Sequence, residues 1–264
     1  MNTLVYFDLE ATGLKSAGRP RITEISLVAI NVRDILDCHE RIKDKIQNPN
    51  IKVKMCQIET ILPRVTNKMA LCVYPMALIM PEVSKLTGLD NYNLTGQTKF
   101  DKNTVDLISC FLAHLPSPVC LVAHNGNLFD FPLLKAEMEK VGKNFEIGLW
   151  CVDSYVGIKE IFKKREEALD IKDATEKSNM FKQENGESRE MHPDKLTGHR
   201  TPTSFSLVNL HQHFLGCPPT KSHGAEADCL ALMRVTAAIG KDWLEYVHDN
   251  CYEFSCCKAM WGST

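Results

Sequence analysis

The order of strand-like and helix-like segments is the feature that most limits the folds open to this chain. Residues 3–10 and 22–32 are apolar and β-rich, and residues 38–46 form a weaker third segment of the same kind. No helical stretch separates these three segments. We therefore expect three antiparallel strands joined by tight connections.

Helical periodicity alternates with short apolar runs in the second half of the chain. Residues 119–123 (VCLVA) are wholly apolar, which is typical of a strand covered on both faces, and a short strand is expected near 148–152. The periodicity predicts helices over 106–115, 128–141, 204–215 and 224–239. Three adjacent strands followed by this alternation predict an α/β fold with a mixed sheet flanked by helices.

Composition is that of an ordinary globular protein. The 264 residues are 44% apolar and 24% charged, which excludes a disordered chain, a collagen and a simple coiled coil. With 31 Lys and Arg against 33 Asp and Glu the formal net charge is −2, so a nucleic-acid site would have to be a local basic surface. We expect a single domain over 1–264.

Residues 163–200 form a charged insertion in that domain. They carry both signs of charge and few large apolar side chains, so they cannot bury enough apolar surface to offset the cost of ordering. We expect a flexible segment. It could be a solvated loop, or a mobile arm whose Lys163, Lys164, Arg165 and Arg189 touch a nucleic-acid backbone.

The cysteine pattern, the N-terminal sequence and the longest apolar stretch indicate the cellular compartment. There are 11 cysteines, an odd number, and no C-x-x-C pair, which favours reduced thiols over a disulfide framework or structural zinc. The start, MNTLVYFDLE, lacks the pattern of a secretory signal, and the longest apolar stretch, 70–80, is broken by Pro75. We expect a cytoplasmic or nuclear protein with no membrane partner.

Carboxylates follow the first strand. Asp8 and Glu10 lie two residues apart at its end, so they point to the same side while Phe7 and Leu9 point to the other. Two neighbouring buried acids repel one another, and a hard cation such as Mg²⁺ removes that penalty. The alternative is that the strand has simply ended and both acids are solvated.

Two further segments carry candidate groups. Asp130 follows the turn after the strand 119–123 and opens a helix, where an acid often only complements the helix dipole. Asp228 lies within a mostly apolar helix, an awkward place for an unpaired charge. His223 can share a pocket with Asp228 only if it lies on the loop before that helix. A lone histidine is more often a surface residue.

Taken together, these segments resemble the three motifs of the DEDDh exonucleases of the ribonuclease H-like fold, and above all the three-prime repair exonucleases. The resemblance runs nearly end to end, and the matching segments are 7–14 (FDLEATGL), 63–73, 86–89 (LTGL), 121–138 (LVAHNGNLFDFPLLKAEM), 151–154 (CVDS), 204–216 and 222–232 (SHGAEADCLAL). The chain departs from better-known members at Leu128, Phe129, Gly224 and Ala227.

The resemblance implies a site and an activity. Two Mg²⁺ ions, which Mn²⁺ could replace, would be held by Asp8, Glu10, Asp130 and Asp228, with His223 as the general base. The residues implied in contact with the terminal bases are Ala11, Leu14, Leu86 and Phe129.

The expected activity is a 3′→5′ exonuclease that releases nucleoside 5′-monophosphates. Its substrate would be single-stranded DNA or frayed duplex ends, and by resemblance the chain would be a homodimer. An exonuclease that prefers RNA and a catalytically weak nucleic-acid-binding protein are the alternatives. The complete set of four acids and His223 argues against the second.

Overall fold

The computed structural model describes residues 1–47, 61–180, 201–220 and 223–262, and its strands form a six-stranded sheet in the order β3-β2-β1-β4-β5-β6. The strands are β1 (Thr3–Ala11), β2 (Ile22–Asn31), β3 (Val65–Cys72), β4 (Val119–Ala123), β5 (Leu149–Asp153) and β6 (Tyr252–Glu253). Strands β1, β4 and β5 are parallel, and β2, β3 and β6 run antiparallel to their neighbours. The predicted mixed sheet with three antiparallel N-terminal strands is confirmed.

The third antiparallel strand is not the predicted one. Residues 38–46 lie in helix α1 (Val32–Gln47), and the edge strand is β3, which pairs with β2. In α1, Ile35, Cys38 and Ile42 recur every three or four residues and are buried, so the apolar side chains follow the helical period. In β3, half-buried and exposed residues alternate, as on a strand with one covered face.

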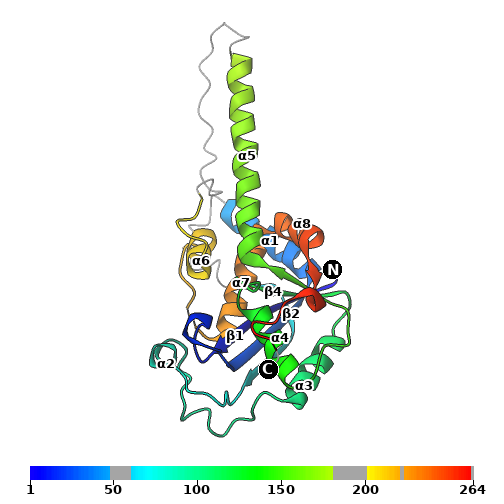
Figure 1. Cartoon of the computed structure of the whole chain (residues 1–264). Coiled ribbons are helices and arrows are strands. Elements are labelled where there is room, and N and C mark those ends of the chain that lie inside the picture. Colours follow the sequence, from blue (N-terminus) through cyan, green and yellow to red (C-terminus); the bar gives the residue numbers. More distant parts are fainter. Residues whose placement is uncertain (48–60, 181–200, 221–222, 263–264) are drawn as a thin grey trace.

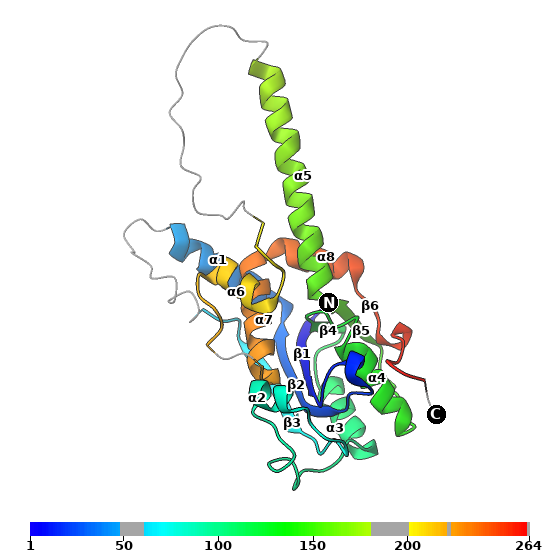
Figure 2. The same ribbon diagram turned by 60° about the vertical axis from the view of Figure 1, so that its left-hand side comes forward.

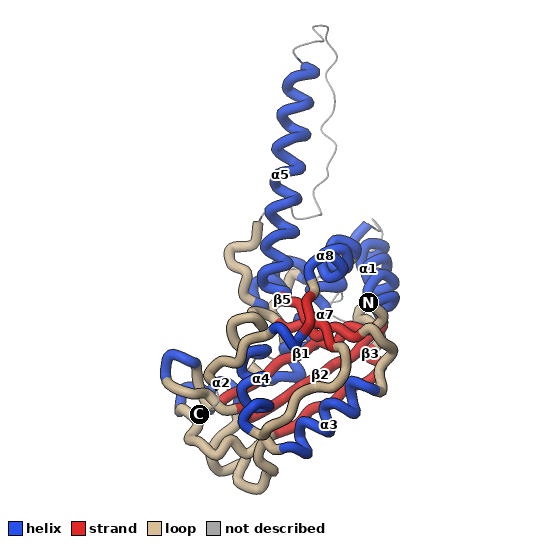
Figure 3. Tube along the Cα trace, turned by 45° about the vertical axis from the view of Figure 1, so that its right-hand side comes forward, coloured by secondary structure: helices blue, strands red, loops and turns tan. Residues whose placement is uncertain are grey.

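Helices cover both faces of the sheet. They are α1, α2 (Pro81–Thr87), α3 (Lys102–Ala113), α4 (Asp130–Lys140), α5 (Ser154–Met180), α6 (Leu207–Leu215), α7 (Ala225–Ile239) and α8 (Lys241–Asn250). Buried side chains of α1, α5, α6, α7 and α8 form one core cluster with the sheet. Those of α3, α4 and the C-terminal segment form the other, and Figure 3 shows α3 and α4 lying over their face of the sheet.

Alternate side chains of β1 belong to different core clusters. Leu4 and Tyr6 belong to the cluster on the α7 side, whereas Val5 and Phe7 belong to the cluster on the α4 side. Because strand side chains alternate between faces, Asp8 and Glu10 continue the set that faces α7. Figure 1 shows α7 next to β1, with α4 close by. The end of β1 is therefore flanked by two helices that each carry a candidate acid.

Helix α5 changes the interpretation of the charged segment. Residues 163–180 continue α5 rather than forming a loop, while residues 181–200 lie outside the described residues. Lys163 pairs with Glu167 one turn later, and Arg165 donates to Asp242 of α8. Such i,i+4 pairs and good helix formers extend a helix without an apolar face. Figures 1 and 2 both show the end of α5 extending beyond the other helices.

Within the part of the chain that the structure describes, no helix combines the length and the apolar character needed to cross a membrane.

Candidate active site

The end of β1 supplies two carboxylates to one side of the sheet. Asp8 and Glu10 are both half-buried, and their strand is central, with β2 on one side and β4 on the other. The β1–β2 pairing shifts register directly after Glu10, so the regular ladder ends where the acids lie. The two side chains are thus held on a rigid strand and face the first turn of α7.

Helix α7 supplies the third carboxylate. Asp228 lies in its first turn, and its Oδ2 accepts a hydrogen bond of 3.1 Å from the backbone N–H of His223. His223 precedes the helix, with an exposed side chain and a left-handed backbone (φ 64°). This meets the geometric condition set by the sequence, that His223 must lie on the loop before the helix to share a pocket with Asp228.

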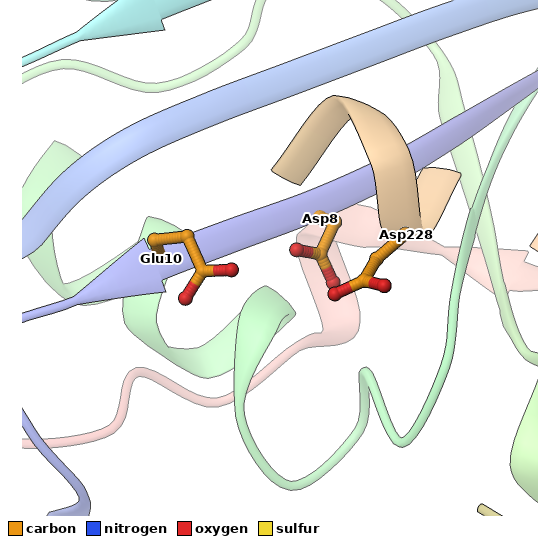
Figure 4. Close-up of side chains that lie close together, drawn as sticks. All are labelled: Asp8, Glu10 and Asp228. Carbon is orange, nitrogen blue, oxygen red and sulfur yellow. The ribbon is translucent and has the colours of Figure 1, made fainter. Parts of the chain in front are cut away.

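Three of the four predicted acids come together. Asp8, Glu10 and Asp228 each offer a carboxylate oxygen, and these oxygens all lie within 4.8 Å of one another. Figure 4 shows the carboxylates of Asp8 and Asp228 close together and that of Glu10 beside them. Asp8 and Glu10 extend from the strand, and Asp228 extends from the helix. Oxygen donors at this spacing are suited to a hard divalent cation.

Asp130 lies beside this group but is not part of it. It is buried at the start of α4, and its Oδ1 accepts a 3.1 Å hydrogen bond from the backbone N–H of Leu9, between the two acids of β1. Its carboxylate is therefore anchored to the strand that carries Asp8 and Glu10. The structure brings Asp130 to the site as a neighbour, with one oxygen engaged by the protein.

Crowding raises the pKa values of these acids. Burial, followed by the charges of Asp130, Glu10 and Asp228, raises the pKa of Asp8 well above its usual range. Burial is also the main reason why the pKa of Glu10 rises to about 8.

Hydrogen bonds limit the rise in pKa of the other two acids, Asp130 and Asp228. Burial raises the pKa of Asp130 to about 7, against the lowering effect of the hydrogen bond from Leu9. Burial raises the pKa of Asp228, and the N–H of His223 opposes it. Four acids that resist ionisation together favour a bound cation, which would compete with the protons.

Glu24 is a neighbouring carboxylate that the sequence analysis did not single out. It pairs with Glu10 across the β1–β2 ladder, and its Oε2 accepts a 3.1 Å hydrogen bond from the N–H of Ala225, the first residue of α7. Glu24 thereby ties the helix of Asp228 to the sheet. The available signal was a single acid within the apolar run of residues 22–30.

Asp153 organises the loop that leads to Asp130. This buried residue ends β5, and its carboxylate accepts hydrogen bonds from the N–H groups of Asn125 and Asn127, both at 3.0 Å, and of Tyr155 at 2.8 Å. His124 is bonded on both ring nitrogens, to Ser154 Oγ and to the carbonyl of Phe205, so it is a framework residue. The sequence marked 151–154 as a matching segment without indicating this role.

The residues expected to contact bases differ in accessibility. Ala11 is 6% exposed, within the α4-side core, and Phe129 is half-buried next to Asp130. Leu14 and Leu86 are exposed by 65% and 56%, in the segment after β1 and in α2. A backbone hydrogen bond of 3.0 Å from Met80 to Thr12 joins these two segments. The base contacts themselves stay a prediction.

Comparison with solved structures identifies the fold. The chain superposes on Escherichia coli ExoI in complex with single-stranded DNA with a TM-score of 0.57, at 13% identity, covering 94% of this chain and 43% of that one. It superposes on a 3′-exonuclease that recognises the histone mRNA stem-loop with a TM-score of 0.55, at 10% identity, covering 96% and 84%. The six-stranded mixed sheet and its flanking helices give the chain a ribonuclease H-like fold, which it shares with these two structures.

Comparison with curated proteins identifies the family. Human three-prime repair exonuclease 1 is 32% identical over 267 aligned positions, covering 100% of this chain and 72% of that protein. Mouse three prime repair exonuclease 2 is 28% identical over 235 positions, covering 88% and 81%. No family model matches the chain. The chain belongs to the three-prime repair exonuclease family and is a 3′→5′ exonuclease.

Proposed function

We propose that this exonuclease removes nucleoside 5′-monophosphates from the 3′ ends of single-stranded DNA and frayed duplexes with the help of two Mg²⁺ ions, which Mn²⁺ can replace. The observation that carries the proposal is the set of three carboxylates within 4.8 Å of one another, beside buried Asp130. All four offer hard oxygen ligands. Their raised pKa values indicate that the ionised carboxylates would be stabilised by a nearby positive charge.

The residues fit such ions by their chemistry. Asp8, Glu10 and Asp228 would hold the metal, and Asp130 would complete the ligand set with the oxygen that does not accept from Leu9. Bound Mg²⁺ would neutralise the charge that develops on the phosphate and stabilise the leaving oxygen. Asp8 and Glu10 on a strand and Asp228 on a helix keep the ligand positions rigid while substrate enters and leaves.

His223 is the proposed general base. Its exposed side chain precedes α7, and its backbone N–H is bonded to Asp228, so the residue lies next to one of the three carboxylates. A neutral imidazole can accept a proton from water as a general base. Because the side chain is exposed and precedes the helix, it can turn toward water when a 3′ end is bound.

Leu14, Leu86, Phe129 and Ala11 are the proposed contacts for the terminal bases. Leu14 and Leu86 are exposed, and apolar or aromatic side chains accept any base by packing or stacking, which suits an enzyme that must digest every sequence. Single-stranded DNA is favoured because the relatives are repair exonucleases and ExoI was solved with such a strand. RNA is the second candidate, since another structural neighbour recognises an mRNA stem-loop.

A homodimer is the proposed assembly. Strand β3 lies at one end of the sheet order, so one of its edges has no partner among the described strands. A two-fold copy of the chain could pair with that edge. Sedimentation equilibrium would test this directly, and a mass equal to one chain at micromolar concentration would contradict it.

The exonuclease proposal is tested by a time course on matched DNA and RNA oligomers. With Mg²⁺, a 5′-labelled DNA strand should shorten stepwise, while a 3′-labelled strand should release its label as a mononucleotide at once. EDTA should stop both reactions. Internal cleavage, undiminished activity in EDTA, or faster degradation of RNA than of DNA would overturn the corresponding part of the proposal.

A further inference from the structure

The thiols of Cys151 and Cys257 lie close together near the loop that precedes Asp130. Cys151 lies on β5 and is fully buried, and Cys257 is half-buried just after the short turn Phe254–Cys256. The two residues are far apart in the sequence, yet their Sγ atoms are 3.7 Å apart. The pair joins the sheet to the C-terminal segment.

Polar groups surround these sulfurs. The Sγ of Cys151 donates to the carbonyl of Tyr252 at 3.5 Å, and the Sγ of Cys257 donates to the hydroxyl of Tyr252 at 3.7 Å. That hydroxyl in turn donates to Oδ1 of Asn127 at 2.5 Å. The thiols are therefore linked to the backbone of β6 and to the loop after β4.

We propose that Cys151 and Cys257 form a redox-active dithiol, a modification site at which peroxide closes a disulfide between β5 and the C-terminal segment. Cys257 is the attacking residue because it is the more accessible of the two. Cys151 is the resolving residue because it is buried directly behind Cys257. The proposal does not rest on the proposed function, because no carboxylate of the candidate active site takes part.

The reaction balances in two steps. The Cys257 thiolate attacks one oxygen of hydrogen peroxide, the O–O bond breaks, and Cys257 becomes a sulfenic acid while water is released. The sulfur of Cys151 then attacks the sulfur of Cys257, the S–O bond breaks, and a second water leaves. Two electrons pass from the two thiols to one peroxide, and both thiol protons end in water.

The surroundings favour Cys257 as the attacking residue. The contact with the Cys151 Sγ lowers the pKa of Cys257 to about 7 against the raising effect of burial, with further lowering from Tyr252 and from the positive charge of Lys135. The pKa of Cys151 is raised, above all by the same contact with Cys257 and also by burial. Closing the bond needs the sulfurs to approach from 3.7 Å to ~2.05 Å, which a side-chain rotation at half-buried Cys257 can supply.

The test uses Cys256→Ser protein as its parent, because this substitution leaves Cys257 as the one cysteine of the adjacent doublet. The folded parent is treated with hydrogen peroxide, quenched with an alkylating agent, digested and mapped by mass spectrometry. We expect a peptide pair joined through Cys151 and Cys257, reversible by dithiothreitol. Peroxide treatment that leaves both thiols free to alkylate, or joins Cys257 to a different cysteine, would overturn the proposal.

Two variants separate the roles of the thiols. In Cys151→Ser the sulfenic acid at Cys257 has no resolving partner, so dimedone should trap about tenfold more adduct at Cys257 than in the parent. In Cys257→Ser neither the cross-link nor a dimedone adduct at Cys151 should form. This second variant changes a half-buried position and remains informative if Cys151→Ser fails to fold. Equal adduct in Cys151→Ser and in the parent would refute the resolving role.

Discussion

At the scale of single residues, the carboxylates of the candidate active site oppose folding when no cation is bound. The pKa of Glu10 rises from 4.5 to about 8 in the folded chain, mainly through burial. Between these two values the unfolded chain has lost the proton that the folded chain still holds. Raising the pH through this window therefore lowers the free energy of unfolding, and below pH 4.5 the penalty disappears.

Glu10→Gln should remove this pH dependence. Without divalent cations, the variant should unfold at a higher temperature than the parent at pH 8, and the difference should shrink as the pH falls toward 5. Thermal unfolding in EDTA across this range measures it. Glu139→Gln, on the other side of the sheet, is the control. A difference that stays constant with pH would contradict the assigned pKa shift.

His223→Ala tests the role of the histidine. Loss of a general base lowers turnover by roughly 10²–10⁴-fold, whereas the carboxylates proposed to hold the cation remain. We expect kcat to fall within that range while the Kd for a DNA strand in Ca²⁺ changes little. His248→Ala, an exposed histidine on α8, should behave as the parent. Turnover at the parental rate in His223→Ala would exclude the general-base role.

At the scale of elements, the site depends on how three segments are tied together. Glu24 of β2 bonds the N-terminus of α7, Leu9 of β1 bonds Asp130 of α4, and Asp153 of β5 bonds the loop between β4 and α4. Each tie is a carboxylate that accepts from a backbone N–H group. Such bonds to charged acceptors are stronger than neutral ones and fix the position of a whole element.

Asp153→Ala should therefore damage both stability and activity. It leaves three backbone N–H groups without their acceptor, at a cost on the order of 3 kcal/mol of unfolding free energy. Turnover should fall as well, because the loop that delivers Asp130 loses its anchor. Urea unfolding and initial rates measure the two effects, and exposed Asp170→Ala on α5 is the control. Unchanged stability would mean that the loop has other anchors.

At the scale of the whole molecule, cation binding should be visible as stability. A ligand that binds the folded state alone stabilises it by about 2.7 kcal/mol at 100 times its Kd. At ~2–4 °C per kcal/mol, Mg²⁺ should raise Tm by roughly 5–10 °C. Asp228→Asn should lose most of this shift because one ligand charge is gone. An equal shift in Asp228→Asn would place the cation away from these carboxylates.

Local sequence patterns were sufficient to predict many of the strands and helices. Strand β4 was predicted with its observed bounds, and β1, β2 and α7 within one or two residues, because period-2 and period-3.6 patterns are set by neighbouring residues. The same alternation placed Asp8 and Glu10 on one side of β1. Correspondence of motifs, rather than periodicity, connected them to Asp130 and Asp228.

Only the tertiary structure decided which segments pair. It made β3 rather than residues 38–46 the third strand, continued α5 through 163–180, and brought Glu24 to the N-terminus of α7. It also directed one oxygen of Asp130 to Leu9 and placed Cys151 against Cys257. These contacts join residues up to 201 positions apart, and no local periodicity encodes them, because their energy exists only once the sheet and helices have packed.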